Sequence, residues 1–432
     1  MKFSEIILVL VYTALFSFII LKWKFFRSFN LSAKFITIIF LCKVGVGILY
    51  GYLHLHLYQG GDTYAYFNES GIVFSTLKNN PWLYLRLVFW ISYPNPAPDI
   101  VPYKDIMWFY TTPDSYFLVR FHSLVRLVSF GYYNVHVVFY NFLTTIGILY
   151  LFLFFEKIIP QKKHLLISVI FFFPSIIFWS SGIHKDGISL AALGLILYFI
   201  NEIAFGKISH GRSIKNFVAL LIGCWLLLLV RNYWLLLLIP AIIAFIWTIN
   251  FPKHTALKFL LIFVVYLGVA INLRLMNPRW DFLKLVATKQ SEFFSIAPGS
   301  QTLALQPLTP SLKSVAAEIP GAIMHCLLRP SFGESNGLLQ FYAAFENILV
   351  ILLLLIAIFF RKKKLSISEK SLLWFCFFFA FTIFILIGII VPILGALVRY
   401  KMAGVLLILI AEVILIKDEI ANNVVFASKF LK

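Results

Sequence analysis

Three ionisable residues stand side by side between two long apolar runs of the sequence. In FWSSGIHKDGIS (178–189), His184, Lys185 and Asp186 follow a short polar stretch. Ionisable groups at membrane depth are costly and often functional. The imidazole and the ammonium could bind an anionic group, and Asp186 adds a carboxylate. The structural alternative is a tight turn whose charges lie at the level of the lipid headgroups.

A second carboxylate follows a pair of glycines in QGGDTYAYFNES (59–70), directly after another apolar run. Gly60 and Gly61 allow the chain to leave a helix in conformations that other residues resist. Asp62 would then lie at the membrane surface, where a carboxylate can act as a general base on a hydroxyl group. The alternative is that Asp62 only caps the helix that follows.

Four further cations flank apolar runs. They are Arg231 in LLVRNYWLL, Arg329 in LLRPSFGES, and Arg399 and Lys401 in LGALVRYKMAG. The guanidinium group offers fixed donors suited to phosphate. The alternative is that these side chains only reach toward lipid headgroups.

The composition defines the class of protein that must position these residues. The chain has 432 residues, of which 61% are hydrophobic and 13% charged, whereas a soluble domain carries roughly 25% charged residues. We therefore predict an all-α polytopic membrane protein, with residues 1–432 as a single transmembrane domain. The eleven spans we expect cover 4–21, 35–54, 133–155, 165–182, 187–205, 216–230, 233–249, 257–273, 339–360, 371–391 and 402–416. No spacing of cysteine and histidine suggests a metal site.

The basic residues predict the orientation. The net charge is +19, but most basic residues lie in short loops between the apolar runs, as the positive-inside rule describes, rather than in a nucleic-acid-binding patch. These loops are assigned to the cytoplasm, which puts the N-terminus outside and the C-terminus inside. Two long loops, 55–132 and 274–338, then face outward, and all the site residues named above face the same side.

The first outward loop should contain helices that lie along the membrane. Residues 62–77 and 115–130 have apolar residues at helical spacing, and the Pro-rich stretch 93–105 between them should be irregular. The second outward loop begins with a polar stretch, 297–311, that we expect to be mobile. Whether 290–315 closes over a substrate stays open. Lys43 and Glu412 fall inside predicted spans and are left out of the site.

This pattern resembles the GT-C superfamily of integral membrane glycosyltransferases. GGDTYAYF (60–67) looks like that superfamily's Asp signature at the start of the first outward loop, and FPSIIFWSSGIHKDGI (173–188) is similar to a Pro, Ser and acidic pattern of its mannosyltransferase-like members. LLRPSFGE (327–334) and GALVRYK (395–401) look like segments of bacterial envelope-polysaccharide proteins. Here, however, the Asp loop follows the second span instead of the first, and Thr63 follows Asp62 where a second acidic residue is common.

The resemblance implies a sugar donor carried on a polyprenyl phosphate, a glycan or lipid-linked acceptor, and a bacterial inner membrane. Asp62 would deprotonate the acceptor hydroxyl, with inversion at the anomeric carbon. Asp186 would orient the acceptor or help to hold a divalent cation, Mg²⁺ or Mn²⁺, although no cofactor is required. The cations for the leaving phosphate would be His184, Lys185, Arg231, Arg329, Arg399 and Lys401.

Two other functions stay open on the sequence alone. A polymerase that joins lipid-linked oligosaccharides also uses outward arginines and a large loop, but does not require Asp62. A lipid or sugar transporter needs polar groups near the middle of the bilayer, where Lys43 is the chief candidate.

Overall fold

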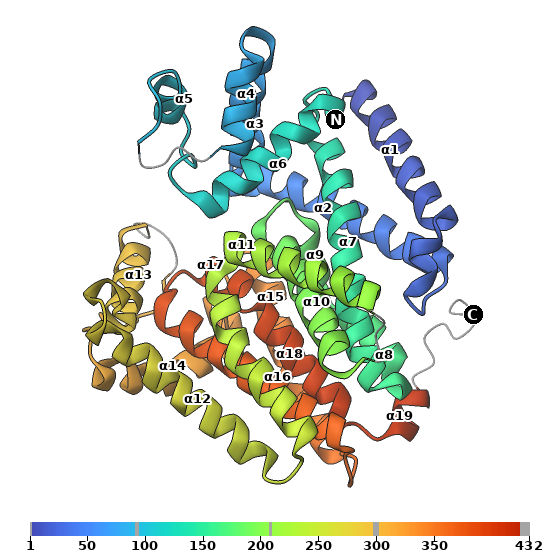
Figure 1. The fold of residues 1–432 in the computed structure, drawn as a ribbon, viewed down its shortest axis with the longest axis vertical. Coiled ribbons are helices and arrows are strands. Elements are labelled where there is room, and N and C mark those ends of the chain that lie inside the picture. The colour runs from blue at the N-terminus through green and yellow to red at the C-terminus, as the bar shows by residue number, and fades with distance from the viewer. Residues whose placement is uncertain (1, 91–94, 207–209, 297–301, 424–432) are drawn as a thin grey trace. The chain divides into compact units, whose positions relative to one another are not determined.

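The protein is described by a computed structural model that covers residues 2–90, 95–206, 210–296 and 302–423 (Figure 1). Nearly all of the described chain is helical, and strand-like pairing within it is limited to two isolated bridges, Thr302 with Ile393 and Arg361 with Ile416. The predicted all-α class is confirmed.

Eight helices in the described residues are long and apolar enough to cross a membrane, and the number rises to ten if each of two bent helix pairs is one span. The eight are α1 (Phe3–Lys22), α2 (Ala33–Leu57), α7 (Tyr133–Ile158), α10 (Lys185–Phe205), α11 (His210–Asn250), α12 (Thr255–Asn272), α15 (Leu338–Phe359) and α16 (Ile367–Ile390). The predicted count of eleven is not confirmed; the expected spans 216–230 and 233–249 both fall within α11, whose backbone leaves the helical region between them at Arg231.

The described apolar helices are bent or broken at three places. The segment Pro160–Phe172, which comprises η2 (Pro160–Lys162), α8 (Lys163–Ile167) and the π-turn η3 (Ser168–Phe172), meets α9 (Pro174–Ser181) at 46°. Pro174 explains this bend, because proline cannot continue the hydrogen-bond ladder. A second bend of 48° separates α17 (Leu394–Tyr400) from α18 (Met402–Leu415). The backbone of Arg231 leaves the helical region inside α11, with φ −149° and ψ 66°.

Contacts divide the chain into two compact units. The first comprises Met1–Phe155 and Ile177–Tyr233, and the second comprises Glu156–Ile176 and Trp234–Val425. This division was not predicted from the sequence, because the boundaries after Ile176 and after Tyr233 fall within expected spans.

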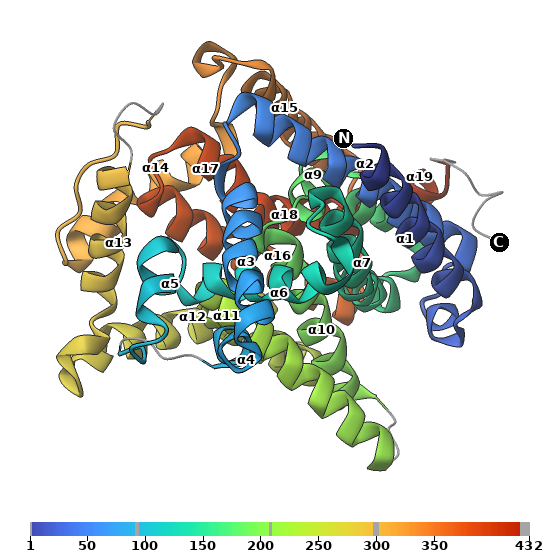
Figure 2. The same cartoon turned by 90° about the horizontal axis from the view of Figure 1, so that it is seen from above.

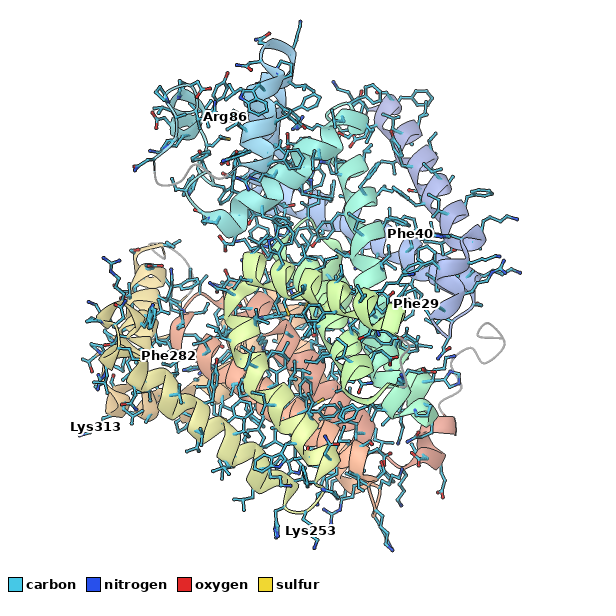
Figure 3. The ribbon with its side chains drawn as sticks, in the orientation of Figure 1. Phe29, Phe40, Arg86, Lys253, Phe282 and Lys313 are labelled. Atoms are coloured by element: carbon cyan, nitrogen blue, oxygen red, sulfur yellow. The ribbon has the colours of Figure 1, made fainter. Side chains whose placement is uncertain are left out.

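Aromatic rings and glycines pack the apolar helices of the first unit. Phe16 stacks on Phe142 with ring centroids 4.3 Å apart. The buried rings of Phe29 and Phe40, labelled in Figure 3, belong to the same packing. A Cβ on Gly147 of α7 would lie 2.6 Å from the Ala191 carbonyl oxygen of α10, so these two helices approach as closely as small residues permit.

The first outward loop folds into four helices in place of the two predicted. They are α3 (Gly61–Asn79), α4 (Pro81–Phe89), α5 (Val101–Ile106) and α6 (Pro113–Ser129). The expected helices are α3 and α6, and Figures 1 and 2 show α3 and α4 side by side. The expectation of an irregular 93–105 is wrong for its second half, because Pro102 occupies the first turn of α5, where proline is tolerated. An ion pair between Arg86 (Figure 3) and Asp99 ties α4 to the chain before α5.

The buried side of α6 is partly polar. His122 and His136 of α7 are both fully buried, and their Nδ1 atoms share a hydrogen bond of 2.9 Å. The Nε2 atom of His136 lies 2.7 Å from Ser129 Oγ. Of the apolar face predicted from the sequence, Val125 is buried, whereas Leu124 and Val128 stay partly exposed. Hydrogen bonding as well as apolar contact therefore attaches α6 to α7.

The second unit is built around α16, which contacts α12, α13 (Phe282–Ile296), α14 (Leu312–Leu328) and α18. Buried Gln290 donates from Nε2 to the Ile389 carbonyl at 2.9 Å and accepts from the Leu308 N–H at 2.8 Å. Leu303 N donates to the Pro392 carbonyl at 2.7 Å. These bonds hold much of the stretch expected to be mobile, of which 297–301 lie outside the described residues. Lys253 and Lys313 point away from the helices in Figure 3.

The buried His122 should make stability sensitive to acid. Burial, and secondly the Arg126 guanidinium, lower the pKa of His122 to about 3. In the unfolded chain this histidine binds a proton below a pH of about 6.5, whereas in the folded chain it stays neutral at that pH. The stability of the fold is therefore fully present above a pH of about 6.5 and falls by up to about 1.4 kcal/mol per pH unit below it. We expect His122→Asn to reduce the drop in thermal unfolding midpoint between pH 7.5 and pH 5.5.

The exposed His56 provides the control. His56→Asn should leave the acid-induced drop as large as in the wild type. An equal drop in His122→Asn and in the wild type would contradict the assignment of this acid sensitivity to His122.

Candidate functional site

Asp62 stands at the point where the chain turns out of α2. Gly60 and Gly61 have φ of +103° and +56°, in the region that favours glycine, so the reason inferred for this pair from the sequence is confirmed. The Gly60 N–H donates to the His54 carbonyl of α2 at 2.9 Å. Asp62 follows in the first turn of α3 with about half of its side chain exposed, and its Oδ2 lies 3.3 Å from His184 Nε2.

His184 joins the turn after α9 to the start of α10. Its backbone is extended, and its Nδ1 accepts a hydrogen bond of 2.9 Å from the Lys185 N–H, so the imidazole caps α10. An accepting Nδ1 places the proton of the neutral ring on Nε2, which then donates to Asp62. A second carboxylate oxygen, Oδ2 of Asp186, lies 3.4 Å from Nδ1. His184 is therefore buried between two carboxylates.

Asp186 and Arg231 form a buried ion pair behind His184. Arg231 Nη2 donates to Asp186 Oδ1 at 2.6 Å, and the two side chains are 6% and 1% exposed. Arg231 Nη1 also donates to the Tyr233 hydroxyl at 2.9 Å. Arg231, which supplies this guanidinium, is the residue at which α11 is broken. Asp186 lies in the first turn of α10, where the helix dipole favours a negative charge.

Lys185 has a partner that the sequence did not suggest. Its Nζ lies 2.5 Å from Oδ2 of Asp114, in the first turn of α6. The available signal was a proline followed by an acidic residue at the start of a predicted helix in the same loop as Asp62. The Asp114 side chain is 42% exposed and that of Lys185 only 14%.

The four pairings give the site its electrostatic character. Its permanent cations, Lys185 and Arg231, each face a carboxylate, and Asp62 faces the imidazole of His184. Three carboxylates thus stand against two permanent cations. The arrangement presents a half-exposed carboxylate, Asp62, that faces the buried imidazole of His184, with the Asp186–Arg231 ion pair on the other side of the ring. A donor at a fixed position can hold a carboxylate in one orientation.

The other predicted site residues, Arg329, Arg399 and Lys401, belong to the second unit. Lys401 is buried, and its Nζ donates to the carbonyls of Cys326 (2.8 Å) and Arg329 (2.8 Å) and to Asn347 Oδ1 (2.7 Å). The Arg399 guanidinium lies 4.8 Å from the Tyr400 ring centre and donates to its hydroxyl. Lys401 therefore holds protein oxygens together, while Arg399 is partly exposed.

Arg329 pairs with Glu334 across the short turn η6 (Phe332–Glu334). Partial burial alone would raise the pKa of Glu334. The N–H and hydroxyl of Ser331 and the charge of Arg329 outweigh it, so the pKa is lowered. The Arg329 side chain stays 40% exposed, which leaves its guanidinium accessible to solvent.

Lys43, left out on sequence grounds, contacts the segment that leads into the site. Its buried Nζ lies 3.0 Å from Ser180 Oγ, four residues before His184. The sequence did not indicate this contact, because Lys43 lies in the middle of a predicted span and therefore far from the predicted membrane surface. Glu412 is likewise buried within α18.

Within the described ranges, no group of three or more His, Cys, Asp and Glu side chains is placed to hold a metal ion. Comparisons of the chain with models of known protein families, with characterised proteins and with solved structures found no match. A function for this site must therefore be argued from its own residues and geometry.

The buried ion pair should be strongly coupled. Removing one partner of such a pair leaves an uncompensated charge and costs about 3–5 kcal/mol. We expect Asp186→Asn and Arg231→Met each to cost about 3 kcal/mol, and the double variant to cost clearly less than the sum. Unfolding of the four proteins in lipid nanodiscs measures this coupling.

The Lys185–Asp114 pair serves as the control, because its aspartate is partly in water. The corresponding cycle with Lys185→Met and Asp114→Asn should give a coupling below about 1 kcal/mol. Additive costs for Asp186→Asn and Arg231→Met would contradict the buried pairing.

Proposed function

We propose that this protein is a membrane glycosyltransferase that moves a sugar from a polyprenyl-phosphate donor to a hydroxyl acceptor on the outer face of the membrane. The observation that carries the proposal is the half-exposed Asp62 carboxylate, backed by buried His184 and by the Asp186–Arg231 pair. A bacterial inner membrane is the setting we infer from the resemblance noted in the sequence.

Asp62 is the proposed general base. Its carboxylate takes the proton of the acceptor hydroxyl as the oxygen attacks the anomeric carbon, and the bond from that carbon to the phosphate oxygen breaks. The His184 Nε2–H donates to Asp62 Oδ2, which fixes the orientation of the carboxylate. The Lys185 N–H, which donates to Nδ1, in turn holds the imidazole. A single attack from the side opposite the phosphate inverts the anomeric carbon.

The leaving phosphate needs positive charge near the membrane surface. Lys185 is the cation of the first unit that we assign to it, since a phosphate oxygen could replace Asp114 at the ammonium. Arg329 and Arg399 of the second unit are partly exposed, and we do not assign them to this phosphate. Lys401 is left out, because its ammonium is buried against three protein oxygens. Asp186 is engaged with Arg231, so we assign it to orientation of the site and not to a divalent cation.

Asp62→Asn tests the proposal. The amide keeps an oxygen that can accept from His184 but cannot take up the acceptor proton, so the rate of sugar transfer should fall at least about 100-fold. The measurement is transfer by the purified protein in lipid, with a panel of polyprenyl-phosphate sugars. Asp105→Asn, an exposed carboxylate of the same loop, should keep the wild-type rate.

The outcomes separate the functions considered. Wild-type transfer that survives Asp62→Asn would rule out Asp62 as the base. If the wild type transfers no sugar from any monosaccharide donor but joins lipid-linked oligosaccharides, the protein is a polymerase.

A further inference from the structure

A buried lysine in the middle of α2 contacts the end of α9. Lys43 is 2% exposed. Its Nζ donates to the Ser180 carbonyl at 3.0 Å, to Ser180 Oγ at 3.0 Å and to Ser181 Oγ at 3.4 Å. All three acceptors are neutral oxygens. The hydrogen bonds that Lys43 donates from α2 thus all go to the last two residues of another helix, α9.

The electrostatics of a helix end explain why an ammonium fits here. The last carbonyls of a helix carry a partial negative charge, which favours a cation. Ser180 and Ser181 are the last residues of α9. Lys43 compensates the Ser180 carbonyl, and this carbonyl and the two serine hydroxyls in turn offset part of the cost of burying the ammonium.

The turn that follows is held by further contacts from α2 and α7. Asn141 Nδ2 of α7 donates to the Ser181 carbonyl at 2.8 Å, and the Tyr140 hydroxyl donates to the His184 carbonyl. A Cβ on Gly47 of α2 would lie 2.6 Å from the Ser181 carbonyl oxygen, so α2 presses directly on the turn. Only three residues lie between Ser180 and His184, which leaves the chain between them little freedom.

We propose that Lys43 is a positioning residue that fixes the turn from Ser180 to Asp186 and so holds His184 against Asp62. Its effect on catalysis rests on the proposed function, whereas its effect on the turn does not. A lysine that only stabilised the bundle would lower stability throughout the first unit. A positioning lysine controls one segment, and a displacement of about 1 Å in a site can reduce a rate on the order of 100-fold.

The test combines hydrogen–deuterium exchange with kinetics on the full-length protein in lipid nanodiscs. In Lys43→Met, amides of 178–187 should exchange at least about 10-fold faster, because Gly182 N–H and Lys185 N–H both donate within this turn. Peptides from α6, and those from the part of α7 that does not contact the turn, should exchange at the wild-type rate. The kcat for sugar transfer should fall about 10- to 100-fold, with the KM for the donor altered less than 3-fold.

Thr37→Val is the matched control. Thr37 is a buried polar residue of the same helix whose Oγ1 donates to the Ala33 carbonyl of α2 itself. It should change neither the exchange of 178–187 nor kcat. If Lys43→Met does not fold, the double variant Ser180→Ala and Ser181→Ala replaces it, because it removes two of the three acceptors and leaves the lysine in place.

Each result decides one question. Unchanged exchange at 178–187, or an increase spread evenly over the first unit in both the lysine and the serine variants, would overturn the proposal. So would a local increase in exchange with an unchanged kcat. A wild-type protein that transfers no sugar would refute the proposed function, while the exchange result would still decide whether Lys43 holds the turn.

Discussion

The buried ion pair between Arg231 and Asp186 is the interaction on which the site depends. In a low-dielectric interior, a carboxylate at the start of α10 requires a cation, and only a residue on a nearby helix can supply it. Arg231 does so from the point where the backbone of α11 leaves the helical region. The break in α11 and the start of α10, which follows His184, are thus joined by one contact.

Several charges around the site lie at helix ends or face them. Asp62, Asp114 and Asp186 each occupy the first turn of a helix, and Lys43 faces the last residues of another. Backbone N–H and C=O groups are unpaired at these places and carry partial charge. A mostly apolar chain can therefore concentrate ionisable groups in one region without burying isolated charges in its hydrocarbon core.

Buried lysine recurs as a structural device in both units. Lys401 donates to two carbonyls and an amide oxygen around the turn after α14, much as Lys43 donates to three oxygens at the end of α9. In each case an ammonium with three donors holds a polar turn that follows an apolar helix. Counting exposed cations from the sequence therefore overestimated the charge available to a phosphate, because Lys401 and Arg231 are used inside the protein.

The sequence by itself determined the features that local chemistry controls. The apolar runs predicted the helices, and the two glycines before Asp62 predicted the turn out of α2. It also brought attention to Arg231, where α11 is broken. Only the tertiary structure decided which polar side chains meet, such as Lys185 with Asp114 and Lys43 with Ser180. Periodicity and turn propensity act over a few residues, whereas these pairings join residues 71 and 137 positions apart, whose proximity depends on how the helices pack.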